Sequence, residues 1–414
     1  MLMDMELAMY RAKTQGKAQG MMEEILVRAK QASEQQDWAL VTQCLHQLPW
    51  NDREPHTQNA ALKLALEVLR EGDFQQRWDV VNIFGKIGPK AIAPLLEILQ
   101  DESAQSQLRW FAGRILGEFD RPEVIFAFVK LLQETEEEDL AVMAAQSLAN
   151  IGTSAIGVLQ ELLLTEDTRL LAVQALAQIR RSDTIGPLLQ VVNDPETEIR
   201  ATAIEALGSF HDLRIVPVLL QGLNDTSVPV RKEAIIALSM LKGQHLPFDL
   251  VQEIKPLLYD LNQQVCRQAA IALGRLGTKE AAEALFPLLK SPATPMWLKI
   301  DIVRALSWNE TVEALEYLGE GLRWGDTEVC QEIVTVLGRK IAPHLKAKAT
   351  QILLEFLHSG QQAASVIQIQ QVLAMALGEL GEITAIETLQ QLAEQENQAV
   401  RLHAQAALRK LISD

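Results

Sequence analysis

Apolar residues recur along this chain at intervals of three and four, the spacing that places side chains on one face of an α-helix. The clearest example is the segment from Glu198 to Phe210. Its predicted apolar face consists of Ile199, Ala203, Ala206 and Leu207. The loop opened by Asp194-Pro195 precedes this helix, and a second helix is predicted at 215–223, so the unit is a pair of helices.

This helix returns eleven times. With Arg200 as the register mark, the equivalent residues are Arg77, Arg109, Ala141, Arg169, Arg200, Arg231, Cys266, Lys299, Cys330, Gln370 and Arg401. Consecutive marks are mostly about 28 to 35 residues apart, with one interval of about 40 before Gln370. Two helices per repeat predict an all-α fold, a right-handed α-α superhelical solenoid of about eleven repeats. We call the helix with the mark the register helix and the helix that follows it the partner helix.

A glycine stands late in many register helices. These glycines are Gly85, Gly117, Gly208, Gly274, Gly338 and Gly378. A residue without a side chain at this point predicts a turn or a close approach of the neighbouring helix.

The pattern Pro-Leu-Leu…Asp…Val-Arg-x-x-Ala-x-x-Ala-Leu-Gly resembles the HEAT repeat, in the short bacterial form of the bilin-lyase-like (PBS lyase HEAT-like) proteins of cyanobacteria. The resemblance extends over roughly Gln75 to Leu411. It implies that the loop Asp and the helix Arg form a ladder between adjacent repeats, and the matching loop residues are Asp194, Asp225 and Asp260, six residues before Arg200, Arg231 and Cys266. The Arg is replaced at Lys299, Cys330 and Gln370, so the ladder is expected to be broken in the C-terminal half.

Two segments depart from the repeat. Residues 1–56 are predicted to form an N-terminal helical extension with helices at Met21–Gln35 and Asp37–Leu48, which caps a solenoid of residues 57–414. Asp4 to Lys17 resembles the last helix of a GGDEF domain, whose signature loop the chain lacks, so no cyclic-dinucleotide synthesis is implied. The long interval before Gln370 indicates an insertion, and a bend or looser junction is placed within 260–370.

Charge and cysteine content narrow the classes of partner. A net charge of −16 argues against nucleic acid, because phosphate binding needs a basic stripe. The three cysteines form no C-x-x-C pair and no secretory leader is evident, which indicates a cytoplasmic location, with peripheral association with a membrane complex left open. The longest uncharged stretch, Leu140 to Gln160, is interpreted as helix-turn-helix, so no transmembrane segment is expected.

No motif for nucleotide, metal or hydrolase chemistry is present, so no catalytic residue, metal ligand or resident cofactor is predicted. Cys266 and Cys330 occupy the register position, either as accessible thiols on one edge or, in the favoured interpretation, as small residues filling a buried slot.

The best candidate for a binding surface is a helix face. Positions two, five and nine after each register mark are expected to point away from the core, on the concave side of the solenoid. The partner-binding candidates on this face are Asp79, Asn82, Phe111, Arg114, Met143, Leu171, Arg304, Trp308 and Arg339. Such a mixture of methionine, aromatic and arginine side chains is typical of protein-recognition surfaces, unless neighbouring helices cover several of them.

Two functions follow. The leading hypothesis is a non-enzymatic protein-binding scaffold or assembly factor whose partner is not identified. The alternative, implied by the resemblance, is a bilin lyase or bilin-handling chaperone acting on a phycobiliprotein or another photosynthetic-complex subunit. A bilin would then be the ligand, with Arg109, Trp110 and Arg114 as its candidate contacts.

Overall fold

A computed structural model describes residues 20–50, 55–243, 248–339 and 341–413. Every regular element in these residues is a helix, as predicted. The chain forms two compact units, Met1–Asn193 and Asp194–Asp414. The predicted boundary after residue 56, the looser junction within 260–370 and the concave placement of the register helices stay predictions. The segment that resembles a GGDEF helix lies outside the described residues.

In the first unit the described residues begin with helical residues 20–34. Its register helices are α4 (Phe74–Ile87), α6 (Ser106–Leu116), α8 (Glu138–Ile151) and α10 (Glu166–Ile179). The other helices are α2 (Trp38–Gln47), α3 (Pro55–Glu71), α5 (Ile92–Gln100), α7 (Pro122–Glu134), α9 (Ile156–Leu162) and α11 (Ile185–Gln190). The predicted N-terminal helix pair is confirmed: the end of its first helix and both ends of its second lie within one residue of the prediction, and the start of the first helix lies at the edge of the described residues.

The second unit continues the alternation. Its register helices are α12 (Thr197–Gly208), α14 (Val228–Met240), α16 (Gln263–Leu276), α18 (Met296–Trp308), α20 (Thr327–Leu337), α22 (Ile367–Leu380) and α24 (Gln398–Ser413). Its partner helices are α13 (Val216–Gly222), α15 (Leu250–Ile254), α17 (Lys279–Lys290), α19 (Val312–Trp324), α21 (Lys346–Leu357) and α23 (Ile386–Ala393).

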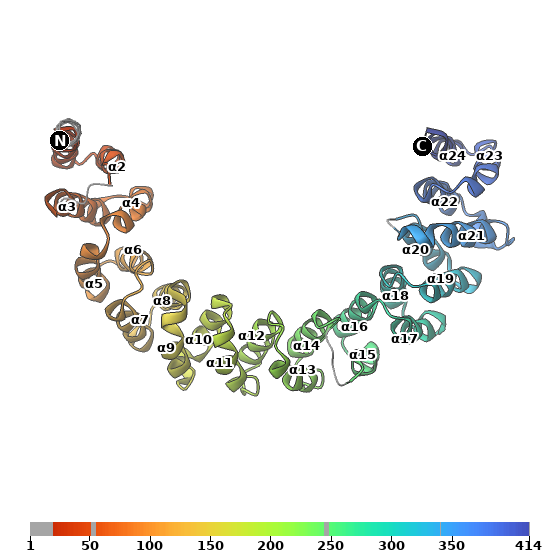
Figure 1. The fold of residues 1–414 in the computed structure, drawn as a ribbon, viewed down its shortest axis with the longest axis horizontal. Coiled ribbons are helices and arrows are strands. Elements are labelled where there is room, and N and C mark those ends of the chain that lie inside the picture. Colours follow the sequence, from red (N-terminus) through yellow and green to blue (C-terminus); the bar gives the residue numbers. More distant parts are fainter. Residues whose placement is uncertain (1–19, 51–54, 244–247, 340, 414) are drawn as a thin grey trace, which may run out of the picture. The chain divides into compact units, whose positions relative to one another are not determined.

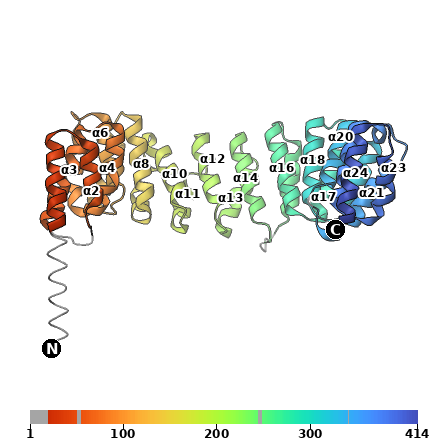
Figure 2. The same cartoon turned by 90° about the horizontal axis from the view of Figure 1, so that it is seen from above.

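Within each unit the register helices pack side by side in one layer and the partner helices lie in the other (Figure 1). Figure 2 shows the register helices of each unit running alongside one another. The apolar face predicted for α12 is the buried one, since Ile199, Ala203 and Leu207 are almost fully covered. Burying one such leucine contributes roughly 1.5–3 kcal/mol to folding.

The segment from Glu138 to Leu162, which contains the uncharged stretch, has the length and composition of a membrane span. The structure divides it into α8, a short 3-10 turn and α9, because Gly152 adopts a φ of 82° and ends α8. The predicted helix-turn-helix of one repeat is therefore confirmed.

The late glycines bring register helices together. A Cβ atom built on Gly274 would lie 2.8 Å from the Cα atom of Ala305 in α18, and one on Gly338 would lie 2.6 Å from the Cα of Ala376 in α22. Similarly close contacts occur at Gly117, Gly208 and Gly378. The predicted close approach is thus confirmed at five glycines, whereas Gly85 meets only the carboxylate of Glu118.

Several register side chains, charged and uncharged, donate a hydrogen bond to a backbone carbonyl group just before their own helix. The guanidinium of Arg200 donates to the carbonyl oxygen of Asp194 at 2.8 Å, six residues earlier. The same contact is made by Arg169, Arg231, Cys266, Gln370 and Arg401. It satisfies a carbonyl group in the loop or helix end that precedes the register helix, where helical partners run out.

The arginines at positions 200 and 231 also reach an aspartate of the next repeat. The guanidinium of Arg200 donates two bonds of 2.9 Å to the carboxylate of Asp225, and Arg231 holds Asp260 at 2.8 and 2.9 Å. Such two-point pairing is the strong form of a charged hydrogen bond. These contacts are the rungs that the resemblance implied.

The ladder changes where arginine is replaced. The thiols of Cys266 and Cys330 bond only to backbone carbonyls nearby. The loop position that carries the aspartate in other repeats is Ala293 after Cys266 and Ala364 after Cys330, so donor and acceptor are lost together. The expected break at Lys299 is incomplete, because its ammonium group lies 4.0 Å from the carboxylate of Asp326.

Opposing effects set the pKa of each rung carboxyl. Burial alone would raise the pKa of Asp225, but hydrogen bonds from the Arg200 guanidinium and the Ser227 amide outweigh it and hold the pKa below its ordinary value. The same balance, with Arg231 and Asn262 as donors, lowers the pKa of Asp260.

These shifts predict how stability depends on pH. A carboxyl with a lowered folded-state pKa stabilises the fold above its unfolded pKa of about 3.9, and this contribution is lost as pH falls through the folded value. We expect the free energy of unfolding to fall less steeply below about pH 4 in an Asp225→Asn/Asp260→Asn variant than in the parent chain. Urea unfolding at several pH values measures the difference, and parallel curves for the two chains would contradict it.

The glycine contacts predict a second effect. A Gly274→Ala substitution is expected to lower the free energy of unfolding by roughly 1–3 kcal/mol, because the new methyl group meets backbone of α18 that cannot move aside. Gly186→Ala is the matched control, since nothing lies within 4 Å of its Cβ position. Urea midpoints followed by circular dichroism compare the two; an equally small effect of both would show that the helices have room to separate.

Candidate partner-binding surface

The exposed face of the register helices differs in part from the predicted one. Positions five and nine after the mark lie at the surface in both units. Among the candidates this places Asn82, Arg114, Arg304, Trp308 and Arg339 at least partly in solvent, and at position two Asp79 is exposed and Leu171 half-buried.

Two of the nine candidates are not at the surface. Phe111 and Met143, both at position two, are fully or almost fully buried, so their expected exposure is wrong. Position two lies at the edge of the exposed face, where the adjacent helix decides whether it is covered. The thioether of Met143 occupies the space beside Gly113 of α6, where a Cβ would come within 2.5 Å of the sulfur.

Four aromatic rings gather at the N-terminal ends of α4 and α6, and we call them the aromatic shelf: Phe74, Trp78, Trp110 and Phe111. The ring of Trp78 is nearly parallel to that of Phe74, with centroids 6.3 Å apart, and to that of Trp110, with centroids 6.4 Å apart. Phe111 meets all three edge-on at 5.3 to 6.1 Å. Phe74 and Trp78 are 57% and 46% exposed, so buried Phe111 supports rings that face solvent.

Local sequence explains this arrangement. Asp73 caps α4 by accepting from the Gln76 amide at 2.9 Å, and the Gln76 side chain accepts from the Asp73 amide, which starts the helix at Phe74. Phe74 and Trp78 are then one turn apart on one face. Trp110 is at the same register position on α6 as Trp78 on α4. Phe74 was missed in the sequence, although its spacing of four from Trp78 is the signal.

The three residues predicted to contact a bilin have different environments in the structure. Arg109 is buried, and its guanidinium donates to the carbonyl of Leu99 at 3.0 Å and pairs with Glu137 at 3.1 Å. Its guanidinium is thus engaged by neighbouring residues of the fold, and a contact between Arg109 and a ligand stays a prediction. Trp110 belongs to the shelf. Arg114, one turn further along α6, is half-exposed and makes no ion pair within the described residues.

On the second unit a chain of ion pairs crosses the face. Arg267 of α16 pairs with Asp301 of α18 at 2.7 Å, and Arg304 of α18 pairs with Glu332 of α20 at 2.7 Å. Arg304 also lies 3.9 Å from Asp301, which joins the two pairs. The hydrogen bond with Glu332 raises the pKa of Arg304. Arg304, a candidate for partner binding, is therefore already occupied by neighbouring carboxylates.

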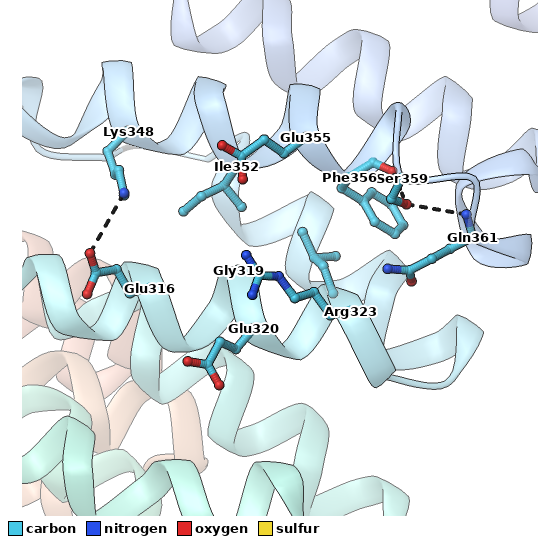
Figure 3. A pocket seen from close by; sticks show the side chains of 11 residues that line it. Glu316, Gly319, Glu320, Arg323, Lys348, Ile352, Glu355, Phe356, Ser359 and Gln361 are labelled. Atoms are coloured by element: carbon cyan, nitrogen blue, oxygen red, sulfur yellow. Dashed lines mark hydrogen bonds and ion pairs between the residues drawn. The ribbon is translucent and has the colours of Figure 1, made fainter.

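A groove of about 420 Å³ lies in the partner-helix layer between α19 and α21 (Figure 3). Its middle is narrow because Gly319 lets Ile352 approach to 3.3 Å from its Cβ position. Lys348 pairs with Glu316 at 3.7 Å at one end, and Ser359 and Gln361 of the insertion lie at the other. The inserted segment thus completes a surface of the partner layer.

The register cysteines are buried, which confirms the favoured interpretation. Burial raises the pKa of the Cys330 thiol to about 11, and burial likewise raises that of Cys266. A thiol with such a pKa stays protonated near neutral pH and is a poor nucleophile. Within the described residues no three His, Cys, Asp or Glu side chains converge to hold a metal ion.

Comparisons with known proteins agree with this architecture. HEAT repeats match residues 92–177, 165–239 and 251–338, together more than half of the chain. Kap121p bound to Ste12p resembles the chain with a TM-score of 0.57 and 15% identity, over 86% of this chain and 46% of that protein.

Kap95p, from a structure of its binding to RanGDP, gives a TM-score of 0.55 and 12% identity over 96% of this chain and 62% of that protein. The chain thus spans about half to two thirds of these proteins, and identities this low show the fold alone. No curated protein matches the sequence. The length of the repeat matches and the solenoid neighbours establish that the chain is an all-α solenoid and belongs to the HEAT-repeat family.

Proposed function

We propose that the chain is a non-enzymatic scaffold or assembly factor that holds a protein partner against the exposed face of its register helices. The observation that carries this proposal is the aromatic shelf. Large aromatic rings grouped in solvent are uncommon on proteins that act alone and are enriched at the centres of protein interfaces.

The shelf exposes more apolar surface than the fold requires. Phe111 is fully buried beneath it, whereas Phe74 and Trp78 are largely in solvent, so shortening either of them would open no cavity comparable to a lost core residue. Covering one such ring with a partner contributes roughly 1.5–3 kcal/mol or more to binding. Exposure of the shelf to solvent is therefore unfavourable in free energy, and covering it in a complex would be favourable.

Structural neighbours favour a protein ligand over a small molecule. The Kap121p structure is of a complex with Ste12p, and the Kap95p structure concerns binding to RanGDP. Those partners belong to those proteins. For this chain the likeness supports only the general use of a HEAT-repeat surface to hold another protein.

The shelf predicts a loss of partner capture. In a quantitative pull-down from the source cell extract, Trp78→Ala/Trp110→Ala is expected to reduce capture of the partner by tenfold or more, with unchanged helical circular dichroism. Trp324→Ala, at a half-exposed tryptophan that ends α19, is the matched control. Equal capture by both variants would place the binding surface elsewhere.

A second candidate function is the handling of a bilin for a phycobiliprotein or another photosynthetic-complex subunit, by a protein of the bilin-lyase-like type. One observation favours it: the rings of Trp78 and Trp110 are near-parallel, and half-exposed Arg114 follows Trp110 by one helical turn, with a guanidinium that could pair with a propionate. Three buried thiols in no disulfide support the reducing, cytoplasmic compartment that such a partner would share.

A spectroscopic titration separates the two functions. If the chain handles bilins, adding phycocyanobilin is expected to shift the absorbance of the pigment, with weaker binding by Trp110→Ala and Arg114→Gln and unchanged binding by Trp324→Ala. Unchanged spectra with the parent protein would remove the bilin function and leave the scaffold proposal intact.

A further inference from the structure

A second surface lies in the other unit, between the register helices α12 and α14. A groove of about 360 Å³ runs between them. One wall is formed by Glu205, Ser209 and His211, and the other by Glu233, Ile236 and Met240. Gly208 leaves the floor without a side chain, because a Cβ there would lie 2.6 Å from that of Ala237.

The charges of this groove differ from those further along the same face of the unit. Across α16, α18 and α20 the carboxylates of Asp301 and Glu332 face guanidinium groups, in the pairs of Arg267 with Asp301 and Arg304 with Glu332. Between α12 and α14, Glu205 faces Glu233, and neither carboxylate forms an ion pair in the described part of the chain. Like charges on adjacent helices oppose folding, so this arrangement is unfavourable for the protein alone.

The pKa of Glu233 reflects this unfavourable environment. Burial, and then the charge of Glu205, raise the pKa of Glu233, while Lys232 acts in the opposite direction. A cation placed between the two carboxylates would relieve the repulsion and replace the water that burial has removed from Glu233.

Apolar side chains beside the two carboxylates indicate what the rest of the ligand would contact. Ile236 and Met240 lie one turn apart on α14, and Met240 is 50% exposed at the end of the helix. They offer a surface for the aliphatic part of an arginine or lysine, which packs its stem on apolar groups while the charged head stays polar. Methionine adapts to such stems because its side chain is unbranched and polarizable.

We propose that this groove docks a basic segment of a protein partner, with an arginine or lysine head between Glu205 and Glu233 and its stem against Ile236 and Met240. The inference goes beyond the aromatic shelf, because it concerns the other unit and states the chemistry of what binds. Complementary charge on a protein of net charge −16 also favours fast association with a basic partner.

The experiment uses the full chain and a defined probe, an acetylated and amidated peptide of alternating leucine and arginine. Its affinity is measured by calorimetry against that of a matched peptide with citrulline in place of arginine. Glu205→Gln/Glu233→Gln is expected to weaken binding of the arginine peptide by tenfold or more. Glu253→Gln/Glu280→Gln removes the same charge from exposed positions of α15 and α17 and is expected to leave the affinity unchanged.

Three further results decide the proposal. The pKa of Glu233, followed by carboxyl NMR, is expected to fall when the arginine peptide is bound. Equal weakening by both double variants would show attraction to net charge alone, and equal affinity for the citrulline peptide or no binding at all would overturn the proposal. Trp78→Ala/Trp110→Ala is expected to bind the probe normally, so failure of the shelf and failure of this groove are distinguishable.

Discussion

One hydrogen bond recurs at six register positions and joins each of these helices to the loop before it, from the register side chain to the carbonyl oxygen six residues earlier. This bond caps the end of one repeat and fixes where the next register helix begins. Arg200 makes this bond with its guanidinium, and at the equivalent positions Cys266 makes it with its thiol and Gln370 with its amide. A guanidinium, a thiol or an amide can therefore satisfy this carbonyl group, whereas the two-point link to the aspartate of the following repeat is made by a guanidinium.

This division explains what the sequence could predict. Helix positions follow from local spacing, so α12 and the N-terminal pair were predicted to within about two residues. The role of the late glycines followed from their lack of a side chain. The exposure of Phe111 and Met143 could not be read in the same way, because a position at the edge of a helix face is buried or exposed according to its neighbour. Gly113, which makes room for Met143, lies in another repeat.

The candidate site shows the same limit. Trp110 and Arg114 were identified from their register positions, but the grouping of four rings depends on the packing of α4 against α6. The commitment of Arg109 to Leu99 and Glu137 follows from its register role, so an arginine at this mark is a structural residue before it is a ligand. Cys266 replaces the ladder arginine and Ala293 replaces the aspartate that it would meet, and Cys330 and Ala364 do the same. Both paired replacements can be seen when the repeats are aligned by sequence.

A repeat protein distributes its stability among local contacts, and this has a consequence for function. A surface residue of one register helix affects only its own repeat and the adjacent ones. An exposed ring such as Trp78 or an opposed pair such as Glu205 and Glu233 therefore disturbs a small part of the chain. Regular repeats of the second unit pair their charges across adjacent helices, which makes a departure from pairing informative. The aromatic shelf and the acidic groove are both surface arrangements that are unfavourable for the protein alone, and in the proposed complexes binding supplies the compensating contacts.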